Sequence, residues 1–530
     1  MNKSNSKFVI GLTLVATLGG LLFGYDTAVI SGAVGSLQSF FIDSLQENTE
    51  KTAQVIWQYR VTVIAVILII SAAISAIIVK LLGNKRGYIY SILLFIFVII
   101  SLTYVFRNPA ILDEETANSI KGFTISSALV GCILGGSIGG FISRKYGRKN
   151  GLILAAILFS ISAIGSSIPE KMNFFGVENI IAFIIYRIVG GVGVGLASML
   201  SPMYIAEIAP PSIRGKLVSW NQFAIIFGML VVYFVNYSIA LKGNASWLVN
   251  TGWRWMFASE AIPAFVFLIL LLFIPESPRF LVMQNKESSA LRLLNKLGSK
   301  ENAEKVLSEI KDSLKVKDAP WLSYGGMLII IGILLSVFQQ FVGINVVLYY
   351  APEIFKSMGS KTDTSLLQTI IVGAVNLTFT VVAIFTVDKF GRKPLQIIGG
   401  LGMAISMFAL GFTFFFQQIG FGALLFMLLY TASFAMSWGP VTWVLLSEIF
   451  PNRIRGAMSI AVASQWIANL IISWTFPIMN DNTWLTNIFH HGFAYWIYGL
   501  MGLLAALFVW KLVPETKGKS LEEMEKLWIK

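Results

Sequence analysis

Long apolar stretches recur along this 530-residue chain and restrict what it can fold into. Each is about 20 residues long or more, the length that an α-helix needs to cross the hydrocarbon core of a bilayer. Only 13% of the residues are charged, whereas soluble proteins average about 25%. The sequence therefore predicts an all-α polytopic membrane protein. We expect fourteen spans, at 8–36, 56–82, 87–106, 119–142, 150–169, 178–207, 216–240, 253–274, 323–355, 365–387, 395–416, 420–449, 454–478 and 489–513.

The basic residues are shared unevenly between the two sides of this predicted bundle. With these spans, 30 of the 40 Lys and Arg residues fall in loops on the side of the termini, and eight fall on the opposite side. The remaining two, Arg60 and Arg187, lie within spans. Loops rich in Lys and Arg stay in the cytoplasm, so we expect both termini there. This topology accounts for the formal charge of +13, and no nucleic-acid partner is expected.

Three short motifs occur twice, in the same order, with offsets of 239 to 244 residues. Each follows a span that ends on the side of the termini, so the repeats run parallel and an axis along the membrane normal relates them. Repeats of this kind place a substrate site near the midplane between two halves. The pairs are Gly147-Arg148-Lys149 with Gly391-Arg392-Lys393, Glu207 and Arg214 with Glu448 and Arg455, and Pro275-Glu276-Ser277 with Pro514-Glu515-Thr516.

The repeats divide the chain into two halves of six spans, with one pair of spans left over. Residues 1–274 form the N-terminal half with a helical hairpin inserted at about 56–106, 321–513 form the C-terminal half, and 514–530 form a cytoplasmic tail. The segment 275–320 has apolar residues at helical spacing among charges, which favours short cytoplasmic helices over a flexible linker. The hairpin has few polar groups, so we expect it to serve as peripheral packing or as a partner surface.

One span carries an unusual group of amides. Gln339, Gln340 and Asn345 lie within seven residues of an apolar run, with Gly343 among them and Tyr349 following. Polar groups inside a membrane are costly and indicate function more often than packing when they cluster, although single amides also join helices. The glycine permits a bend that lets these side chains converge. Because amides both donate and accept hydrogen bonds, they suit a ligand rich in hydroxyls, such as a sugar.

Taken together, the motifs resemble the sugar porter family of the major facilitator superfamily, most closely the bacterial D-xylose:proton symporters. The resemblance covers nearly the whole chain except roughly 44–115, and the ordered set of motifs is specific. It implies a major facilitator fold of two six-helix halves, here with the hairpin making 14 transmembrane helices. The motifs are Gly24-Tyr25-Asp26, Gly147-Arg148-Lys149, Arg187 with Gly190-Gly191, Pro275 to Arg279, Gln339 to Tyr350, Asp388 to Lys393, Trp438-Gly439-Pro440 and Pro514 to Gly518.

The function that the resemblance implies is proton-coupled monosaccharide symport by alternating access, with D-xylose as the expected sugar. It assigns the sugar contacts to Gln222, Gln339, Gln340, Asn345, Trp443 and Gln465, with Phe23, Tyr349, Asn376, Gly439 and Trp466 as weaker candidates. Met229 stands where we associate the xylose symporters with another amide, so a hexose such as glucose stays open. A facilitative uniporter and a membrane sugar sensor are further alternatives, but a sensor needs an output module and only sixteen residues follow Pro514.

Two charged residues within the spans carry the coupling hypothesis. At 1.5 Å per helical residue, Asp26 and Arg187 reach depths at which they can meet in the outer half of the membrane. An unpaired ion there is costly, so we expect the two to pair. The resemblance implies that Asp26 carries the proton and that Arg187 pairs with its deprotonated form, whereas a purely structural ion pair is the alternative. Glu260 could assist, and a structural role fits it equally well.

The remaining charges predict a salt-bridge latch on the cytoplasmic side, which the resemblance implies and which solvated loop charge could also explain. Both histidines, His490 and His491, sit together at one helix start, and the sequence has no nucleotide-binding loop or metal cluster. We therefore expect no enzyme activity, metal or cofactor, and a proton gradient as the driving force. We expect a monomer in the bacterial inner membrane whose partners are a monosaccharide, a proton and the lipid bilayer. The latch residues are Arg144, Arg148, Glu207, Arg214, Asp388, Arg392, Glu448 and Arg455.

Overall fold

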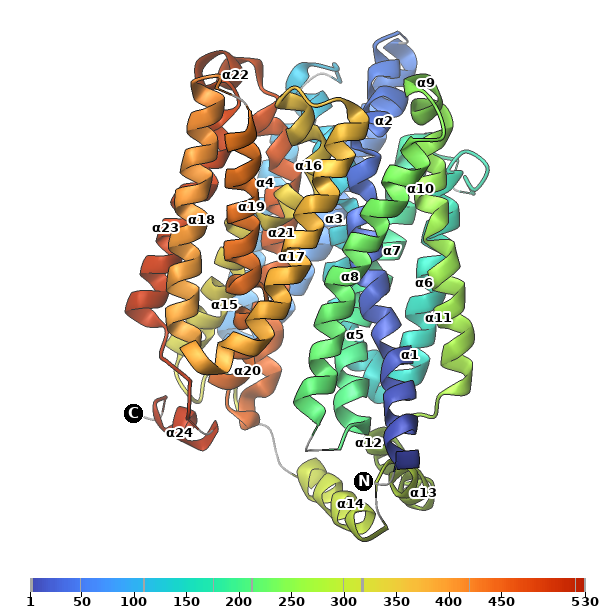
Figure 1. The fold of residues 1–530 in the computed structure, drawn as a ribbon, viewed down its shortest axis with the longest axis vertical. Helices are drawn as coiled ribbons and strands as arrows, with labels where there is room; N and C mark the ends of the chain where they lie inside the picture. The colour runs from blue at the N-terminus through green and yellow to red at the C-terminus, as the bar shows by residue number, and fades with distance from the viewer. Residues whose placement is uncertain are drawn as a thin grey trace.

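The computed structural model describes residues 3–47, 49–107, 110–174, 176–210, 213–298, 300–315, 319–418, 420–519 and 521–528. Within these ranges, fourteen helical segments are long and apolar enough to cross a membrane, which confirms the predicted all-α polytopic fold. Both termini lie at the same end of the bundle (Figure 1). We call this end the terminus face and the opposite end the far face.

The membrane-crossing helices follow one another along the chain with short connections. In the N-terminal half and its hairpin they are α1 (Lys3–Val29), α3 (Thr49–Leu82), α4 (Asn84–Arg107), α5 (Glu114–Tyr146), α6 (Arg148–Ser167), α7 (Asn179–Ile208), α8 (Arg214–Ala240), α10 (Trp253–Ser259) and α11 (Ala261–Phe273). In the C-terminal half they are α15 (Gly326–Phe341), α16 (Ile344–Ser357), α17 (Thr362–Phe390), α18 (Arg392–Phe415), α19 (Phe421–Met436), α20 (Trp438–Ile449), α21 (Met458–Asn480) and α23 (Gly492–Leu512).

Shorter helices cover the ends of the bundle. On the far face these are η1 (Ile30–Gly32), α2 (Val34–Leu37), η2 (Gln38–Ile42), η3 (Asp43–Glu47), α9 (Ala245–Trp247), η4 (Leu248–Gly252) and α22 (Thr483–Phe489). On the terminus face they are α12 (Pro278–Met283), α13 (Glu287–Leu297), α14 (Lys300–Lys315), η5 (Asn452–Ala457) and α24 (Leu521–Lys526). Helices α12 to α14 therefore occupy the segment between the halves for which the sequence favours short amphipathic helices.

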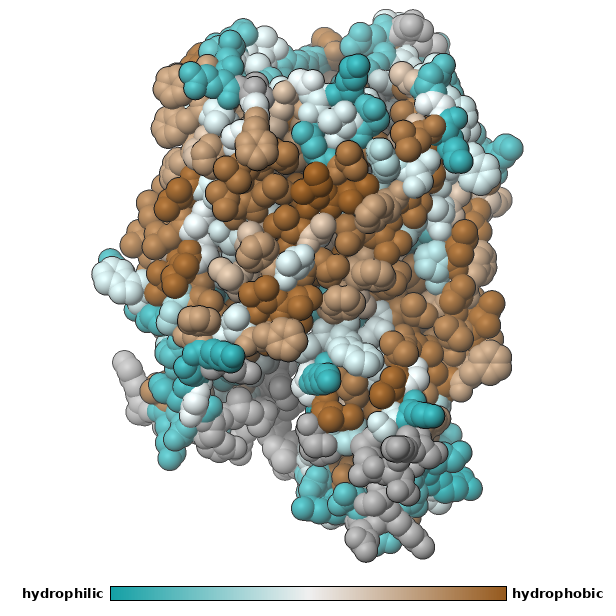
Figure 2. All heavy atoms as spheres, viewed as in Figure 1, coloured by the Kyte–Doolittle hydropathy of each residue, from teal (hydrophilic) through white to brown (hydrophobic). Residues whose placement is uncertain are grey.

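The surface of the bundle matches a bilayer. Hydrophobic side chains form a belt around the middle of the molecule, and hydrophilic ones gather at the two ends (Figure 2). Large apolar residues in this belt are strongly exposed, with Phe273 at 80% and Ile405 at 68%. Exposed apolar surface of this extent is unfavourable in water and favourable against lipid chains. Contact with lipid therefore explains why so many apolar side chains are exposed on the surface of the bundle.

The two halves pack against each other along two seams. Helix α5 packs against α21, and α8 packs against α17. At the first seam the helices approach closely because glycine lacks a side chain: a Cβ atom built on Gly122 would lie 2.1 Å from the carbonyl oxygen of Trp474. The substrate site expected from the repeats would lie between these seams.

Three of the spans are interrupted. The α15–α16 span breaks at Gly343, whose φ of 91° lies in the left-handed region, and a Cβ atom there would lie 2.8 Å from the ring of Tyr498. The prediction that this glycine permits a bend is confirmed. The α19–α20 span breaks at Ser437 (φ −131°, ψ −85°), and α10 gives way to α11 at Glu260. Such breaks in a membrane are tolerated where the backbone lines a cavity or is buried in protein.

The inserted hairpin consists of α3 and α4, which turn at Gly83 (φ 76°). Near the far face its Tyr59 hydroxyl lies 2.9 Å from the Ser119 hydroxyl of α5. Near the terminus face its Lys80 ammonium lies 3.9 Å from the ring centroid of Trp321, the first residue of the C-terminal half. The hairpin therefore contacts the N-terminal half at one end of the bundle and the start of the C-terminal half at the other.

Candidate functional site

The amides that the sequence singles out form a connected group beside two helix breaks. The Gln339 side chain donates to the carbonyl oxygens of Trp438 (2.9 Å) and Gly439 (3.2 Å), just after the Ser437 break. The Gln340 amide donates to Gln339 Oε1 (3.4 Å), and Asn345 Nδ2 donates to Gln340 Oε1 (2.5 Å). This chain fixes the orientation of each amide. It leaves lone pairs and N–H groups for further partners, because each amide has two donors and two acceptor positions.

Aromatic side chains from the two halves also meet within the bundle. The Phe23 ring of α1 lies 5.7 Å, centroid to centroid, from the Trp466 ring of α21. The neighbouring Gln465 is buried, and its Oε1 atom accepts no hydrogen bond from the described residues. An unsatisfied buried acceptor is costly, so a hydroxyl donor from a ligand would satisfy it. Phe23, Trp466 and Gln465 thus offer apolar ring faces and an unpaired amide oxygen, which suit a sugar ring with hydroxyls.

The other predicted sugar contacts lie on neighbouring helices. Gln222 on α8 and Trp443 on α20 are half-buried. Tyr349 on α16 and Asn376 on α17 are buried. Among the described residues, no hydrogen bond given by the structure joins these four to the amide group, so their part in the site stays a prediction. Met229, the residue that departs from the expected amide, is buried on α8.

Asp26 and Arg187 form a fully buried ion pair. The guanidinium of Arg187 on α7 donates from Nη1 to Asp26 Oδ1 (2.7 Å) and from Nη2 to the Asp26 carbonyl oxygen (2.9 Å) of α1. The side chains are 0% and 1% exposed. The structure therefore brings together the two residues that the depth argument pairs. Asp26 Oδ2 and Arg187 Nε have no hydrogen-bond partner among the described residues, so the pair is incompletely satisfied.

Glu260 adds a second buried carboxyl group to this pair. It stands at the α10–α11 break, is 0% exposed, and neither of its oxygens has a hydrogen-bond partner among the described residues. It interacts electrostatically with both Asp26 and Arg187. Two carboxylates beside one guanidinium carry one negative charge more than the buried site can neutralise, and an uncompensated buried charge is strongly unfavourable. The arrangement therefore favours one proton shared by the two carboxyl groups.

The predicted latch residues form matching ion pairs at the terminus face. Arg148 donates to Glu207 Oε1 from Nη2 (2.7 Å) and Nε (3.2 Å) in the first half. Arg392 donates to Glu448 from Nη2 (2.8 Å) and Nε (3.2 Å) in the second half. Each pair joins helices of one half only. That these pairs release the terminus face during transport stays a prediction.

The other four latch candidates are placed differently. Arg144 is exposed and forms no ion pair with the described side chains. Arg214 is exposed and donates to the Ala209 carbonyl oxygen (3.4 Å) of its own half. The side chains of Asp388 and Arg455 lie outside the part of the chain that the structure describes.

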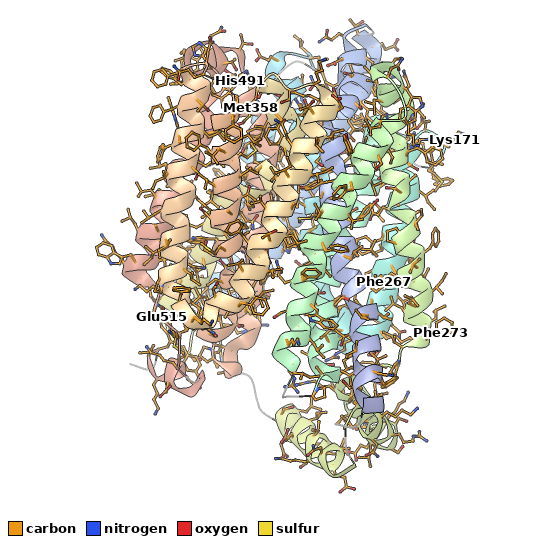
Figure 3. All side chains as sticks on the ribbon, in the orientation of Figure 1. Lys171, Phe267, Phe273, Met358, His491 and Glu515 are labelled. Atoms are coloured by element: carbon orange, nitrogen blue, oxygen red, sulfur yellow. The ribbon has the colours of Figure 1, made fainter. Side chains whose placement is uncertain are left out.

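Two residues of this network were not assigned a role from the sequence. Glu276 accepts from the backbone N–H groups of Arg148 (3.0 Å) and Lys149 (3.1 Å), at the start of α6. Glu515, labelled in Figure 3, accepts from those of Arg392 (3.2 Å) and Lys393 (3.1 Å), at the start of α18. A carboxylate at a helix N-terminus is favourable. Burial raises the pKa of Glu276, and these hydrogen bonds oppose that rise. The sequence did contain a signal for this role, because a Pro-Glu pair occurs at the corresponding place in both repeats.

Comparisons with known proteins agree with this architecture. The chain matches the family described as "Sugar (and other) transporter" over residues 12–108 and 98–528. It is 54% identical over 539 residues to the D-xylose-proton symporter of Escherichia coli K12, covering 99% of this chain and 96% of that protein. It is 40% identical over 532 residues to the "Glucose facilitated diffusion protein" of Zymomonas mobilis, covering 99% of each.

A solved structure described as the inward open conformation of the xylose transporter XylE from E. coli is also similar. It superimposes with a TM-score of 0.78 at 52% identity, over 98% of this chain and 100% of the other. Fold, internal repeats and sequence thus point to one group of proteins. This chain belongs to the sugar transporter family of the major facilitator superfamily.

Proposed function

We propose that this protein is a proton-coupled sugar symporter that carries D-xylose. The observation that carries the proposal is the buried group of Asp26, Arg187 and Glu260, which is built to hold one proton without contact with solvent. A transporter that only equilibrates a sugar has no need of such a site, and buried ionisable groups in membrane spans mark ion pathways. The 54% identity to a D-xylose-proton symporter supports the same function.

The sugar would bind among the amides and aromatic rings contributed by both halves. Gln339, Gln340, Asn345 and Gln465 supply donors and acceptors for the hydroxyl groups, and the Trp466 ring covers an apolar face of the sugar. Gln222 and Trp443 complete this site as direct contacts, with Phe23, Tyr349, Asn376 and Gly439 around them. A hydroxyl left without a partner costs about 1–3 kcal/mol, so the amides set which sugar is accepted.

Coupling would follow from competition for Arg187. When the carboxyl group of Asp26 is ionised, it attracts Arg187 and accepts the hydrogen bond from Nη1, while the Asp26 carbonyl oxygen accepts a second one from Nη2, so α1 is held to α7. When a proton taken up from solution neutralises Asp26, the attraction between these helices falls and the loaded carrier can rearrange. One charge crossing a potential of 100 mV supplies about 2.3 kcal/mol, enough for roughly fifty-fold accumulation of a neutral sugar.

The proposed topology places the terminus face in the cytoplasm of a bacterial inner membrane, with the protein acting as a monomer. The distribution of Lys and Arg residues supports this orientation. The ion pairs of Arg148 and Arg392 then lie on the cytoplasmic side, where they stabilise the inner ends of each half as separate units.

A hexose such as glucose is the second candidate substrate. The supporting observation is Met229, which buries an apolar side chain on α8 where an amide was expected. A relative named as a glucose facilitated diffusion protein shares 40% identity with this chain. The two candidates share every other feature of the site.

Uptake by purified protein in liposomes tests both parts of the proposal. Labelled xylose and labelled glucose are supplied outside, with and without an imposed pH gradient, acid outside. We expect xylose to accumulate above its external concentration only when the gradient is present. Preferential accumulation of glucose would make glucose the substrate in place of xylose. Equal internal and external sugar concentrations, with or without the pH gradient, would refute coupling.

A further inference from the structure

An ion pair between the two halves closes the α5–α21 seam at the far face. Lys121 on α5 donates from Nζ to Asp481 Oδ2 at the end of α21, over 2.8 Å. The Lys121 side chain is 11% exposed and that of Asp481 is 30% exposed. The Asn480 amide donates to the second oxygen of Asp481 (2.7 Å), which fixes the carboxylate toward Lys121.

Further hydrogen bonds join the two halves at and beside this seam. The carboxylate of Glu114, in the first turn of α5, accepts from the backbone N–H of Thr483 (2.5 Å) and from the Thr483 hydroxyl (2.6 Å). The Trp474 indole of α21 donates to the Ser119 carbonyl oxygen of α5 (3.0 Å). Among the described residues, all these polar contacts between halves lie toward the far face.

The terminus face has no ion pair between the two halves among the described residues. Its ion pairs, Arg148 with Glu207 and Arg392 with Glu448, each stay within one half. Between the described residues, the halves are therefore joined by an ion pair at the far face, whereas at the terminus face the hairpin adds only the contact of Lys80 with the Trp321 ring. This asymmetry indicates that the far-face contacts determine which end of the transporter stays closed.

We propose that Lys121 and Asp481, supported by Glu114 and Thr483, form a far-face latch that favours the arrangement closed on that side. The four are positioning residues: they touch neither the amide group nor Asp26, and they act by holding α5 against α21. The proposal rests on the proposed function only in that a transporter must open toward both sides in turn. Opening the far face separates these helices, so the ion pair must break in every cycle.

The surroundings of the latch allow it to break and re-form. A cavity of about 290 Å³ adjoins it, lined by Gln38, Asp43, Asp113, Glu114 and Lys121, among others. Water in this cavity can solvate the Lys121 ammonium once the charges part, and the Asp481 side chain is already 30% exposed, so the pair contributes a modest stabilisation like other partly exposed ion pairs. A contribution of this size changes the ratio of the two arrangements by about five-fold. Such a latch biases the transporter without locking it.

Distances between spin labels test the latch without any sugar. Labels are attached to cysteines placed at Glu115 on α5 and Trp484 on α22, both of which are exposed, while the native Cys132 is buried. We expect Lys121→Met to raise the ratio of long to short distances about five-fold. Asp481→Asn should do the same, because it removes the other charge. Unchanged distance distributions in both variants would refute the latch.

Matched variants separate the latch from general damage. Lys171→Met removes an exposed lysine of the far face that forms no ion pair with the described residues (Figure 3), and it should leave the distances unchanged. Lys121→Arg keeps the charge and should behave like the unaltered protein. The double variant Lys121→Asp with Asp481→Lys should restore the short distance that each single reversal loses. Failure of this restoration would overturn the role of the ion pair.

Transport kinetics provide a second readout. The apparent affinity for a ligand falls with the fraction of protein that is competent to bind it. Lys121→Met enlarges the fraction open at the far face, so the KM for xylose supplied on that side should fall, by at most about five-fold. A structural defect would raise this KM. A different result is that the unaltered protein transports no xylose while the distances between spin labels still change as expected in the Lys121 and Asp481 variants. That result would refute xylose as the substrate and would support the far-face latch.

Discussion

The substitution Asp26→Asn separates proton coupling from sugar movement. The amide keeps the shape of the side chain and cannot release a proton. The roughly fifty-fold accumulation that a 100 mV potential supports should therefore fall to simple equilibration. Exchange of labelled for unlabelled xylose should continue, because exchange requires no net proton transfer. Both are measured in the same liposomes, with and without the gradient.

The structure also sets the stability cost of this substitution. The pair is 0% and 1% exposed, and removing one partner of a buried ion pair costs about 3–5 kcal/mol. Here Glu260 is buried, interacts electrostatically with Arg187, and has no hydrogen-bond partner for either oxygen among the described residues, so it can ionise and replace the lost charge. We therefore expect a loss below about 3 kcal/mol for Asp26→Asn and the full cost only for Asp26→Asn combined with Glu260→Gln.

A cycle of single and double substitutions measures this difference. The free energy of unfolding is determined for the unaltered protein, both single variants and the double variant in one detergent. A strongly non-additive loss is expected, because each carboxyl group substitutes for the other. Additive losses would show that Glu260 does not compensate Arg187. Accumulation of xylose by Asp26→Asn to the level of the unaltered protein would refute the coupling role of Asp26.

Three further predictions follow from the site and the fold. Gln340→Ala should weaken xylose binding by about ten-fold in calorimetry, whereas unchanged affinity in a folded variant would remove Gln340 from the site. Gly343→Ala should destabilise the protein more than Gly359→Ala, because both glycines have φ near 90° but only at Gly343 would a Cβ atom meet the Tyr498 ring; equal losses of thermal stability would contradict this. A cysteine at Asn84 should react with an impermeant reagent only from the cytoplasmic side, and reaction from outside would invert the hairpin.

Much of the fold follows from the sequence because its causes are local. Span length and charge bias alone predict fourteen helices, and the break at Gly343 follows from a residue that readily adopts positive φ. The pairing of Asp26 with Arg187 follows from the cost of a lone charge in lipid. Each of these inferences uses one segment at a time, or the depth of two segments in a shared bilayer.

Contacts that depend on how the halves meet could not be predicted in this way. Lys121 and Asp481 are 360 positions apart, and nothing near either residue indicates the other. The break at Ser437 is marked locally by Pro440, which cannot donate a hydrogen bond to the Met436 carbonyl oxygen, but nothing local places this break beside Gln339. The interaction of Gln339 with the Trp438 and Gly439 carbonyl oxygens depends on that break. These features need the packed structure.

The carboxylates that cap α6 and α18 bear on whether the two halves need to be covalently linked. Glu276 fastens the end of the first half to its own α6, and Glu515 fastens the end of the second half to its own α18. The last residues of each half are thus bound to a helix of the same half. In the first half this contact precedes the connecting helices α12 to α14, and in the second it lies at the start of the tail. The peptide linking the halves transmits little of the force that holds them together, which comes from the α5–α21 and α8–α17 seams. Two separate polypeptides, cut between α13 and α14, would carry all the contacts needed to assemble one transporter.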